Sequence, residues 1–271
     1  MIPVETGDAS LPELLAPLCA DPPGAGVLCD IDGTLAPIVG DPAEAEVPSE
    51  TREALASLAS AYGLVACISG RRALEARRIV GVDGIAYAGN HGFELLPPGA
   101  DEPVPDPGLG RRAAATAEFV AALDGPALES VGLRIEDKGP IQALHWRRAP
   151  DRPAAEAHAR AIAERARRAG LVTRWGRMVL ELRPVAGIDK GSATNRLVRE
   201  AGVGTALFGG DDETDLDAFT ALRWLERAGR LQTAVCVGVA SDEQPDGLPE
   251  RTDVLVDGTE GFLEVLRALA V

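Results

Sequence analysis

Short apolar runs alternate with helical patterns at both ends of the chain. Residues 27–29 are too short a run for a helix and lead into an acidic turn, as buried parallel strands often do. The apolar runs 64–68, 85–88 and 206–208 also end in polar clusters, and helical spacing, as over residues 49–62, fills intervals between them. Alternating strands and helices imply parallel crossovers with helices on both faces. We therefore expect an α/β core with a doubly wound, mostly parallel sheet.

The pattern changes over residues 97–107, where Pro, Gly, Asp and Glu accumulate as in a linker. A helix, two alternating strand-like runs, an Ala/Arg/Glu-rich helix and two more strand-like runs follow, over residues 111–123, 132–136, 141–146, 154–169, 172–175 and 178–182. Alternation with one polar face is typical of an antiparallel sheet half covered by helices. We expect residues 1–105 and 187–271 to form the core and residues 106–186 an inserted α+β domain, with hinges at residues 97–107 and 184–189.

Composition narrows the class of protein. The 271 residues are 46% hydrophobic and 25% charged, which is typical of a globular protein and argues against disorder. The formal net charge of −15 repels phosphate backbones and anionic lipids, so we expect neither nucleic acid nor membrane as a partner. The sequence has no apolar run of membrane-spanning length and no signal-peptide pattern at its start. We expect a cytoplasmic enzyme or binding protein.

The four cysteines do not suggest a disulfide framework or a zinc site. Cys19, Cys29, Cys67 and Cys236 are widely separated, and no two of them form a C-x-x-C pair. We expect buried, reduced thiols.

The chemistry-bearing residues gather where strands end. Ligands of open α/β sheets bind beyond the carboxyl ends of the strands, and four such ends are polar here, at residues 30–34, 69–71, 89–92 and 210–212. Several carboxylates at one edge repel one another unless a cation lies among them. Mg²⁺ accepts carboxylates, waters and phosphate oxygens as ligands. The acidic crowding therefore predicts a metal, and the metal explains how an acidic protein binds phosphate.

The D-x-D-x-T spacing predicts two carboxylates with separate tasks. Asp30 is the expected nucleophile, which forms an aspartyl-phosphate, and Asp32 is the expected acid and base for the two half-reactions. Lys190 opens a helix and places a cation near the phosphoryl oxygens. We expect the phosphate to be bound by Lys190, by the hydroxyls of Thr34 and Ser69 and by adjacent backbone N–H groups, including that of Gly70. The expected metal ligands are Asp30, Asp32, Asp211 and Asp212, with Asp215 as an alternative support.

Each of these motifs is weak when it stands alone. An acidic pair at a strand end is often a turn or a helix cap, and Asp212 could cap the helix that follows it. In the present chain, four segments resemble, in the same order, the motifs of the haloacid dehalogenase (HAD) superfamily of phosphatases: DIDGT, ISGR, DKGSA and GGDDETD. The order of elements in the insert is similar to the type IIB cap of that superfamily. The resemblance implies a HAD-like core with a cap domain.

A narrower resemblance lies within this superfamily. The segments YAGNHGFEL, EDKGPIQALHWR, GRMVLELRP and GDDETDLDAF are together similar to trehalose-6-phosphate phosphatases. This implies Mg²⁺-dependent hydrolysis of trehalose 6-phosphate, a mobile cap that grips the disaccharide, and a functional link to a trehalose-6-phosphate synthase. The implied substrate-binding residues are Asn90, His91, Glu136, Lys138, His145, Arg147, Arg177 and Glu181. For Arg177 the family commonly has lysine, and both His91 and His145 are equally compatible with a purely structural role.

Two other functions stay open at this point. The core and cap could serve a different sugar-phosphate phosphatase, for example one that acts on sucrose phosphate or mannosyl-phosphoglycerate. A non-catalytic sugar-phosphate sensor is less consistent with the sequence, because binding alone does not require the pair Asp30 and Asp32 at this spacing.

Overall fold

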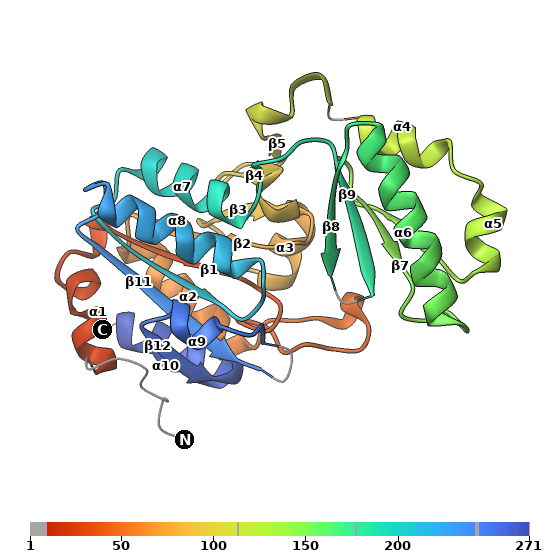
Figure 1. Cartoon of the computed structure of the whole chain (residues 1–271). Helices are drawn as coiled ribbons and strands as arrows, with labels where there is room; N and C mark the ends of the chain where they lie inside the picture. Colours follow the sequence, from red (N-terminus) through yellow and green to blue (C-terminus); the bar gives the residue numbers. More distant parts are fainter. Residues whose placement is uncertain (1–9, 113, 177, 242–243, 271) are drawn as a thin grey trace. The chain divides into compact units, whose positions relative to one another are not determined.

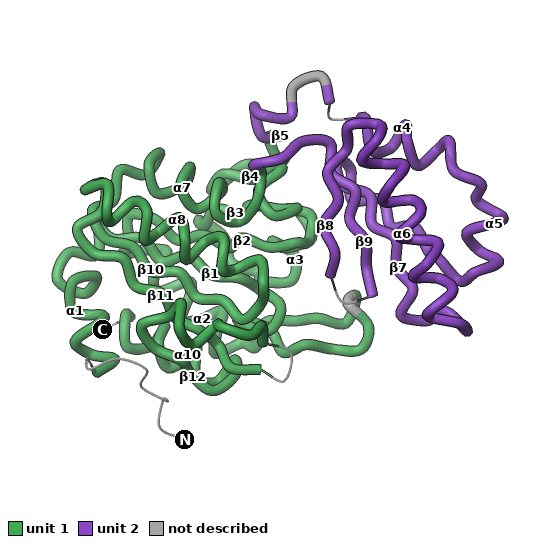
Figure 2. The backbone as a smooth tube through the Cα atoms, viewed as in Figure 1, with its two compact units in different colours: residues 1–104, 188–271 green, residues 105–187 purple. Residues whose placement is uncertain are grey.

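The computed structural model describes residues 10–112, 114–176, 178–241 and 244–270, and it divides the chain into two compact units. Met1–Val104 and Ile188–Val271 form the first unit, and Pro105–Gly187 form the second (Figure 2). The breaks expected at residues 105/106 and 186/187 lie one residue from these bounds. The first unit is called the core below, and the second is called the insert.

The core is built on an eight-stranded sheet with the order β12-β11-β10-β1-β2-β3-β4-β5. Its strands are β1 (Ala25–Cys29), β2 (Leu64–Ile68), β3 (Ala86–Gly89), β4 (Glu94–Leu96), β5 (Val104–Pro105), β10 (Thr205–Gly210), β11 (Thr233–Ala240) and β12 (Val254–Asp257). The pairs from β12 to β3 are parallel, and β4 runs antiparallel to β3. The expected mostly parallel sheet is confirmed.

Helices cover both faces of this sheet (Figure 1). They are α1 (Leu11–Ala20), α2 (Ser49–Ala61), α3 (Ala73–Val80), α7 (Lys190–Ala201), α8 (Asp215–Arg227), α9 (Leu248–Arg251) and α10 (Gly258–Leu269). Alternate residues of β1 face opposite sides: Val27 belongs to the apolar cluster with α2 and α10, and Leu28 to the cluster with α7 and α8. Both faces of β1 are therefore buried, which explains why the strand is apolar throughout.

The register of β1 determines where the acidic motifs meet. Cys29 lies opposite Gly209 of β10 on one side and opposite Cys67 of β2 on the other. Because all three strands are parallel, the segments that follow them leave from the same edge of the sheet. Motifs almost 180 residues apart in the sequence are thereby brought next to each other.

In its described residues, the insert contains a four-stranded antiparallel sheet and three α-helices. Its strands are β6 (Arg134–Asp137), β7 (Gln142–His145), β8 (Val172–Gly176) and β9 (Val179–Arg183), in the order β6-β7-β9-β8. Its helices are α4 (Ala115–Ala121), α5 (Gly125–Ser130) and α6 (Arg152–Arg168). Leu144 and Leu180 pack in one apolar cluster with alanines of α6, so the residues that alternate with them form the opposite, polar face of the sheet.

Three local expectations need correction. The helix expected over residues 111–123 is shorter, and an additional helix, α5, follows it because Asp124 caps a new N-terminus, with its side chain accepting from the Ala127 N–H at 3.2 Å. Helix α1 lies ahead of the first expected strand and was not anticipated. The thiols of Cys29, Cys67 and Cys236 are buried as expected, but Cys19 is exposed.

Four short 3₁₀ segments complete the described elements, at Pro22–Gly24, Pro42–Glu44, Asn90–Gly92 and Pro107–Arg112. Within the described ranges, no helix combines the length and the apolar character that crossing a bilayer requires.

Candidate active site

A buried lysine lies among three carboxylates at the carboxyl edge of the core sheet. The Nζ atom of Lys190 is 3.0 Å from Oδ1 of Asp30, 2.8 Å from Oδ1 of Asp215 and 3.7 Å from Oδ1 of Asp212. Lys190 and Asp30 are 1% and 3% exposed. Asp30 directly follows β1, and its backbone N–H donates to the Gly209 carbonyl of β10. The nucleophile and the cation predicted from the sequence are therefore in direct contact.

The start of α7 places Lys190 in this position. Asp189 accepts a hydrogen bond from the Ser192 N–H, and the Ser192 hydroxyl accepts one from the Asp189 N–H, so the helix begins with a reciprocal cap. A cation in the first turn is unfavourable for the helix dipole. The surrounding carboxylates compensate for this cost, which indicates that Lys190 is there for the site and not for the helix.

The acidic motif after β10 is held together by its own side chains. Asp215, which is fully buried, accepts hydrogen bonds at Oδ2 from the N–H groups of Asp211 and Asp212. Asp212 accepts at Oδ1 from the N–H groups of Thr214 and Asp215 and from the Thr214 hydroxyl. Asp212 thus caps the turn that leads into α8, as the sequence allowed, while it also faces Lys190.

Asp211 contacts the acidic turn after β1. The Thr34 hydroxyl donates to Oδ1 of Asp211 at 2.9 Å, so the structure gives this hydroxyl a carboxylate partner, and a phosphate contact by Thr34 stays a prediction. Gly33 has a φ of +89°, and a Cβ atom there would lie 2.2 Å from Oδ2 of Asp211. Only glycine combines this backbone conformation with so close an approach.

The donor set fits a hard divalent cation. Oxygen atoms of Asp30, Asp212 and Asp215 all lie within 4.8 Å of one another, and Asp211 is adjacent. Four carboxyl groups lie near a single ammonium group, so their ionised forms carry more negative charge than Lys190 balances. Carboxylate oxygens are the ligands that such cations prefer. Asp32, predicted as a further ligand, does not belong to this group of mutually close oxygens among the described residues, and its role at a metal stays a prediction.

Asp32 is instead bound by Arg71. The guanidinium donates to both carboxylate oxygens, from Nε to Oδ2 and from Nη2 to Oδ1, each at 2.7 Å. Its Nη1 donates to Glu75 in the first turn of α3 at 2.6 Å. A bidentate arginine fixes the plane and the orientation of the carboxylate.

Burial dominates the electrostatics of the cluster. It raises the pKa of Asp30 to about 8, against the opposing effect of Lys190, and that of Asp211 to about 7, with Asp215 and Asp212 adding to it. Burial would lower the pKa of Lys190, but the surrounding carboxylates raise it well above its ordinary value, so the ammonium stays charged. Burial alone would raise the pKa of Asp212, but the charge of Lys190 and the hydrogen bond from Thr214 have the larger effect and lower it.

These shifts predict a pH-dependent response to metal. Because Asp30 and Asp211 bind protons more tightly in the folded than in the unfolded protein, their contribution to the free energy of unfolding falls as the pH rises from about 4 to about 8. A cation competes with those protons and binds better at the higher pH. We expect saturating Mg²⁺ to raise the unfolding temperature by at least about 2 °C more near pH 8 than near pH 6.

Differential scanning fluorimetry with and without Mg²⁺ measures this difference. Asp211→Asn is the matched variant and should reduce the pH dependence. An equal shift at both pH values would contradict the assignment of these carboxyl groups to a cation.

The predicted phosphate loop is fixed by the turn that follows β3. The N–H of His91 donates to the Ser69 carbonyl at 2.8 Å, and that of Asn90 donates to the Arg71 carbonyl at 2.7 Å. Ser69 is buried, and its Oγ accepts from the Arg71 N–H at 3.2 Å. A Cβ atom at Gly70 would lie 2.9 Å from the His91 ring, so glycine allows the loop to pass close to it.

Asn90 and His91 are buried and both have left-handed backbone conformations, with φ of 52° and 59°. Asn90 Nδ2 donates to Glu94 at 3.3 Å, and the same carboxylate oxygen accepts from the Ala73 N–H at the start of α3 at 2.7 Å. Glu94 therefore connects this turn to α3. The structure gives Asn90 and His91 a position that supports the phosphate loop, and direct contact with substrate stays a prediction.

In the insert, the polar face of the sheet carries a chain of alternating charges. His145 Nε2 lies 2.8 Å from Glu136 Oε2, and Lys138 Nζ lies 3.9 Å from that oxygen and 3.6 Å from Glu181 Oε1. Arg183 continues the chain with a contact to Glu181 Oε2 at 2.6 Å. The hydrogen bond with His145 lowers the pKa of Glu136, so this carboxylate is ionised at neutral pH.

Two further sugar contacts in the insert were predicted. Arg147 follows β7 with an exposed side chain, and its carbonyl accepts from Arg152 Nε at 3.1 Å. Arg177 lies outside the described residues.

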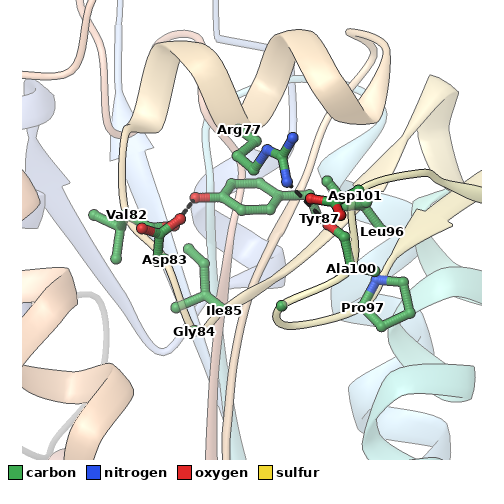
Figure 3. A pocket seen from close by; sticks show the side chains of 11 residues that line it. Arg77, Val82, Asp83, Gly84, Ile85, Tyr87, Leu96, Pro97, Ala100 and Asp101 are labelled. Atoms are coloured by element: carbon green, nitrogen blue, oxygen red, sulfur yellow. Dashed lines mark hydrogen bonds between the residues drawn. The ribbon is translucent and has the colours of Figure 1, made fainter.

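A separate cavity of about 140 Å³ lies at the opposite edge of the core sheet (Figure 3). The residues that line it include Val82 and Asp83 before β3 and Pro97 and Ala100 after the antiparallel β4, which places the cavity at the amino end of β3. The Tyr87 hydroxyl donates to the Val82 carbonyl at 2.5 Å. Ligands of open α/β sheets bind at the carboxyl edge, so this cavity is not the candidate active site.

Comparison with known protein families shows to which family this chain belongs. Residues 28–246 match the trehalose-phosphatase family. The chain belongs to this family.

Among curated proteins, this trehalose-phosphatase family member is 36% identical over 239 residues to a trehalose-phosphate phosphatase of Mycobacterium avium, which covers 82% of the chain and 59% of that protein. It is 39% identical over 211 residues to a protein of Mycobacterium tuberculosis described as an uncharacterized glycosyl hydrolase, which covers 73% of the chain and 15% of that protein. The chain thus spans about three fifths of the first relative and a small part of the second.

Solved structures show the same fold. The C-terminal domain of a trehalose-6-phosphate phosphatase of C. albicans superposes with a TM-score of 0.76 at 22% identity, over 99% of this chain and 98% of that domain. A haloacid dehalogenase-like hydrolase of Bacteroides thetaiotaomicron gives a TM-score of 0.62 at 15% identity, over 89% of this chain and 97% of that one. The expected HAD-like fold is confirmed.

Three residues with site contacts were not singled out as functional in the sequence. Arg71 lies in ISGR, one of the segments that resemble HAD motifs, and Glu94 and Arg183 lie in the segments that resemble trehalose-6-phosphate phosphatases. Their positions in ISGR, HGFEL and LELRP are the signal that could have found them. Asp215 was named only as an alternative to Asp212, although it is the most deeply buried carboxylate of the cluster.

Proposed function

We propose that this protein is a phosphatase that hydrolyses trehalose 6-phosphate to trehalose and phosphate through an aspartyl-phosphate intermediate. The observation that carries the proposal is the buried contact between Asp30 and Lys190 within the carboxylate cluster, at the edge of the sheet where α/β enzymes bind their ligands. The trehalose-phosphate phosphatase from Mycobacterium avium supports this choice of substrate.

In the first half-reaction, an oxygen of the Asp30 carboxylate attacks the phosphorus atom and the bond between phosphorus and the sugar oxygen breaks. Asp32 supplies the proton that the leaving sugar oxygen takes. Lys190, Ser69 and the N–H of Gly70 bind the phosphoryl oxygens, whose negative charge the ammonium balances.

In the second half-reaction, Asp32 accepts a proton from the water that attacks the acyl-phosphate, and the Asp30 carboxylate is released with inorganic phosphate. The pairing of Asp32 with Arg71 fits both half-reactions, because the guanidinium holds the carboxyl group in one orientation.

We further propose that the cation is Mg²⁺, held by Asp30 and the Asp211–Asp212 motif with support from Asp215. When bound, it balances the charge of the phosphoryl group and of the carboxylates. Its oxygen ligands and the excess negative charge of the cluster support Mg²⁺ over a softer metal.

The polar face of the insert is the proposed site for the sugar hydroxyls. Ionised carboxylates accept and ammonium groups donate, so the alternating chain of Glu136, Lys138, His145 and Glu181 offers both kinds of hydrogen bond to a polyol. Arg147, Arg177, Asn90 and His91 stay proposed as further contacts. We also propose that the enzyme works in the cytoplasm, and that its substrate links it to the synthase that makes trehalose 6-phosphate.

Phosphate release from a panel of sugar phosphates tests this function. We expect trehalose 6-phosphate to be hydrolysed with a kcat/KM at least ~10²-fold above that of glucose 6-phosphate and sucrose 6-phosphate. EDTA should abolish this activity and Mg²⁺ should restore it. Equal turnover across the panel would favour a broader sugar-phosphate phosphatase, and binding without phosphate release in the presence of Mg²⁺ would favour a sensor.

Glu181 provides a test of the sugar site alone. Replacing Glu181 with alanine should raise KM for trehalose 6-phosphate by about 10- to 100-fold, because a charged acceptor for sugar hydroxyls is lost. KM for p-nitrophenyl phosphate, which has no sugar, should change less than twofold. Steady-state kinetics with both substrates measure the difference, and equal effects on the two would remove Glu181 from the sugar site.

A further inference from the structure

Arg183 is a buried arginine on the polar face of the insert. It is the last residue of β9 and is only 4% exposed. Glu181 is two residues earlier on the same strand, so both side chains project from the same face of the sheet. Burying a guanidinium is costly unless a carboxylate and good hydrogen-bond geometry compensate for it. The buried guanidinium of Arg183 therefore needs a carboxylate partner.

That partner is one oxygen of Glu181. Nη2 and Nε of Arg183 donate to Oε2 of Glu181 at 2.6 and 3.1 Å. The other oxygen, Oε1, lies 3.6 Å from Nζ of Lys138. The two oxygens of this carboxylate thus face different cations, and both of these guanidinium hydrogen bonds go to the first oxygen.

This division fixes the direction of the second oxygen. A glutamate side chain has three rotatable bonds, and a carboxylate held by a single ammonium group can still swing and turn about them. A planar guanidinium with two N–H groups on one oxygen restricts both movements, which a lysine in the same place cannot do. A lysine at position 183 would balance the charge of Glu181 but would not fix its orientation. Replacing Arg183 with lysine therefore distinguishes a positioning role from simple charge balance.

We propose that Arg183 is a positioning residue that holds the Glu181 carboxylate so that its Oε1 atom accepts a hydrogen bond from a sugar hydroxyl of the substrate. The inference rests on the proposed function, in which Glu181 contacts the sugar. Preorganisation of this kind lowers the cost of ordering the side chain when substrate binds.

Steady-state kinetics of Arg183→Lys, Glu181→Gln and the double variant, all with Mg²⁺, test the proposal. We expect Arg183→Lys to raise KM for trehalose 6-phosphate about 10-fold, with kcat within about twofold of the wild type. Both constants for p-nitrophenyl phosphate should stay within about twofold. In the Glu181→Gln background, Arg183→Lys should raise KM by less than about twofold, because the carboxylate it positions is gone.

Two controls separate this role from a structural one. Arg168→Lys, an exposed arginine at the end of α6, makes the same chemical change away from the polar face and should leave both substrates unaffected. Arg183→Met, which leaves Glu181 buried without its partner, is expected to lower the unfolding temperature, so thermal unfolding accompanies every variant.

Each result is decisive. An unchanged KM for trehalose 6-phosphate in Arg183→Lys, or an effect that multiplies with that of Glu181→Gln, would overturn the positioning role and leave the proposed function intact. Equal losses for both substrates would show a structural role and overturn it as well. If Glu181→Gln itself leaves KM for trehalose 6-phosphate unchanged, the proposed sugar site fails, and this inference fails with it.

Discussion

An Asp30→Asn variant is expected to release phosphate from trehalose 6-phosphate at least ~10⁴-fold more slowly than the wild type. The amide nitrogen and oxygen of asparagine cannot attack phosphorus as a carboxylate oxygen does, so the acyl-phosphate does not form. The substitution is nearly isosteric and replaces a buried carboxyl group with a neutral amide, so the fold should persist. Single-turnover assays of phosphate release, with circular dichroism as a check of folding, measure both effects.

Asp83→Asn is the matched control, because it makes the same change on an exposed residue at the opposite edge of the sheet and should leave turnover unchanged. Trapping of a phosphorylated protein from the wild type, and its loss in Asp30→Asn, would support the covalent step. Turnover by Asp30→Asn at more than a few per cent of the wild-type rate would exclude Asp30 as the nucleophile.

Removing the ammonium of Lys190 is expected to affect stability as well as activity. In Lys190→Met the carboxylates of Asp30, Asp212 and Asp215 lose their shared cation, and breaking a buried charge arrangement of this kind costs about 3–5 kcal/mol of the free energy of unfolding. Because burial raises the pKa of Asp30 to about 8, protonation relieves part of this repulsion at lower pH. The loss of stability should therefore be greater near pH 8 than near pH 6.

Urea unfolding in EDTA and in Mg²⁺ tests this expectation. A divalent cation should stabilise Lys190→Met more than it stabilises the wild type, since the variant carries one positive charge less beside the carboxylates. Lys190→Arg retains the charge and should unfold closer to the wild type. If Lys190→Met in EDTA unfolds at the same urea concentration as the wild type, the ammonium does not hold this cluster together.

The pattern of apolar runs was sufficient to predict the core because every central strand of a parallel sheet has the same surroundings. Strands such as β1 and β10 are buried on both faces and read as short apolar runs, and their carboxyl ends meet at one edge. The meeting of Asp30 with Asp211 and Asp212 follows from this rule alone. Lys190 followed from its place at a helix start where a cation is unfavourable.

What the pattern could not predict are partnerships between long side chains. The choice of Arg71 for Asp32, and of Arg183 for one oxygen of Glu181, depends on side-chain conformations that hydrophobic spacing does not encode. Helix α5 was missed because a local cap at Asp124 decided it. Asp215 lies in the first turn of α8, where its position relative to Lys190 depends on how two helices pack.

The position of β1 has a consequence for biosynthesis. This strand pairs with β2 on one side and with β10 on the other, and the two neighbours are separated in the sequence by the whole insert. While the ribosome has not yet released residues beyond about 189, one edge of β1 lacks its neighbour and the face with Leu28 lacks the cover of α7 and α8. Such edges and faces are prone to aggregation. A nascent chain that stops before β10 should therefore require chaperone protection and yield no partly active fragment, because Asp30, the proposed nucleophile, lies at the seam between β1 and β10.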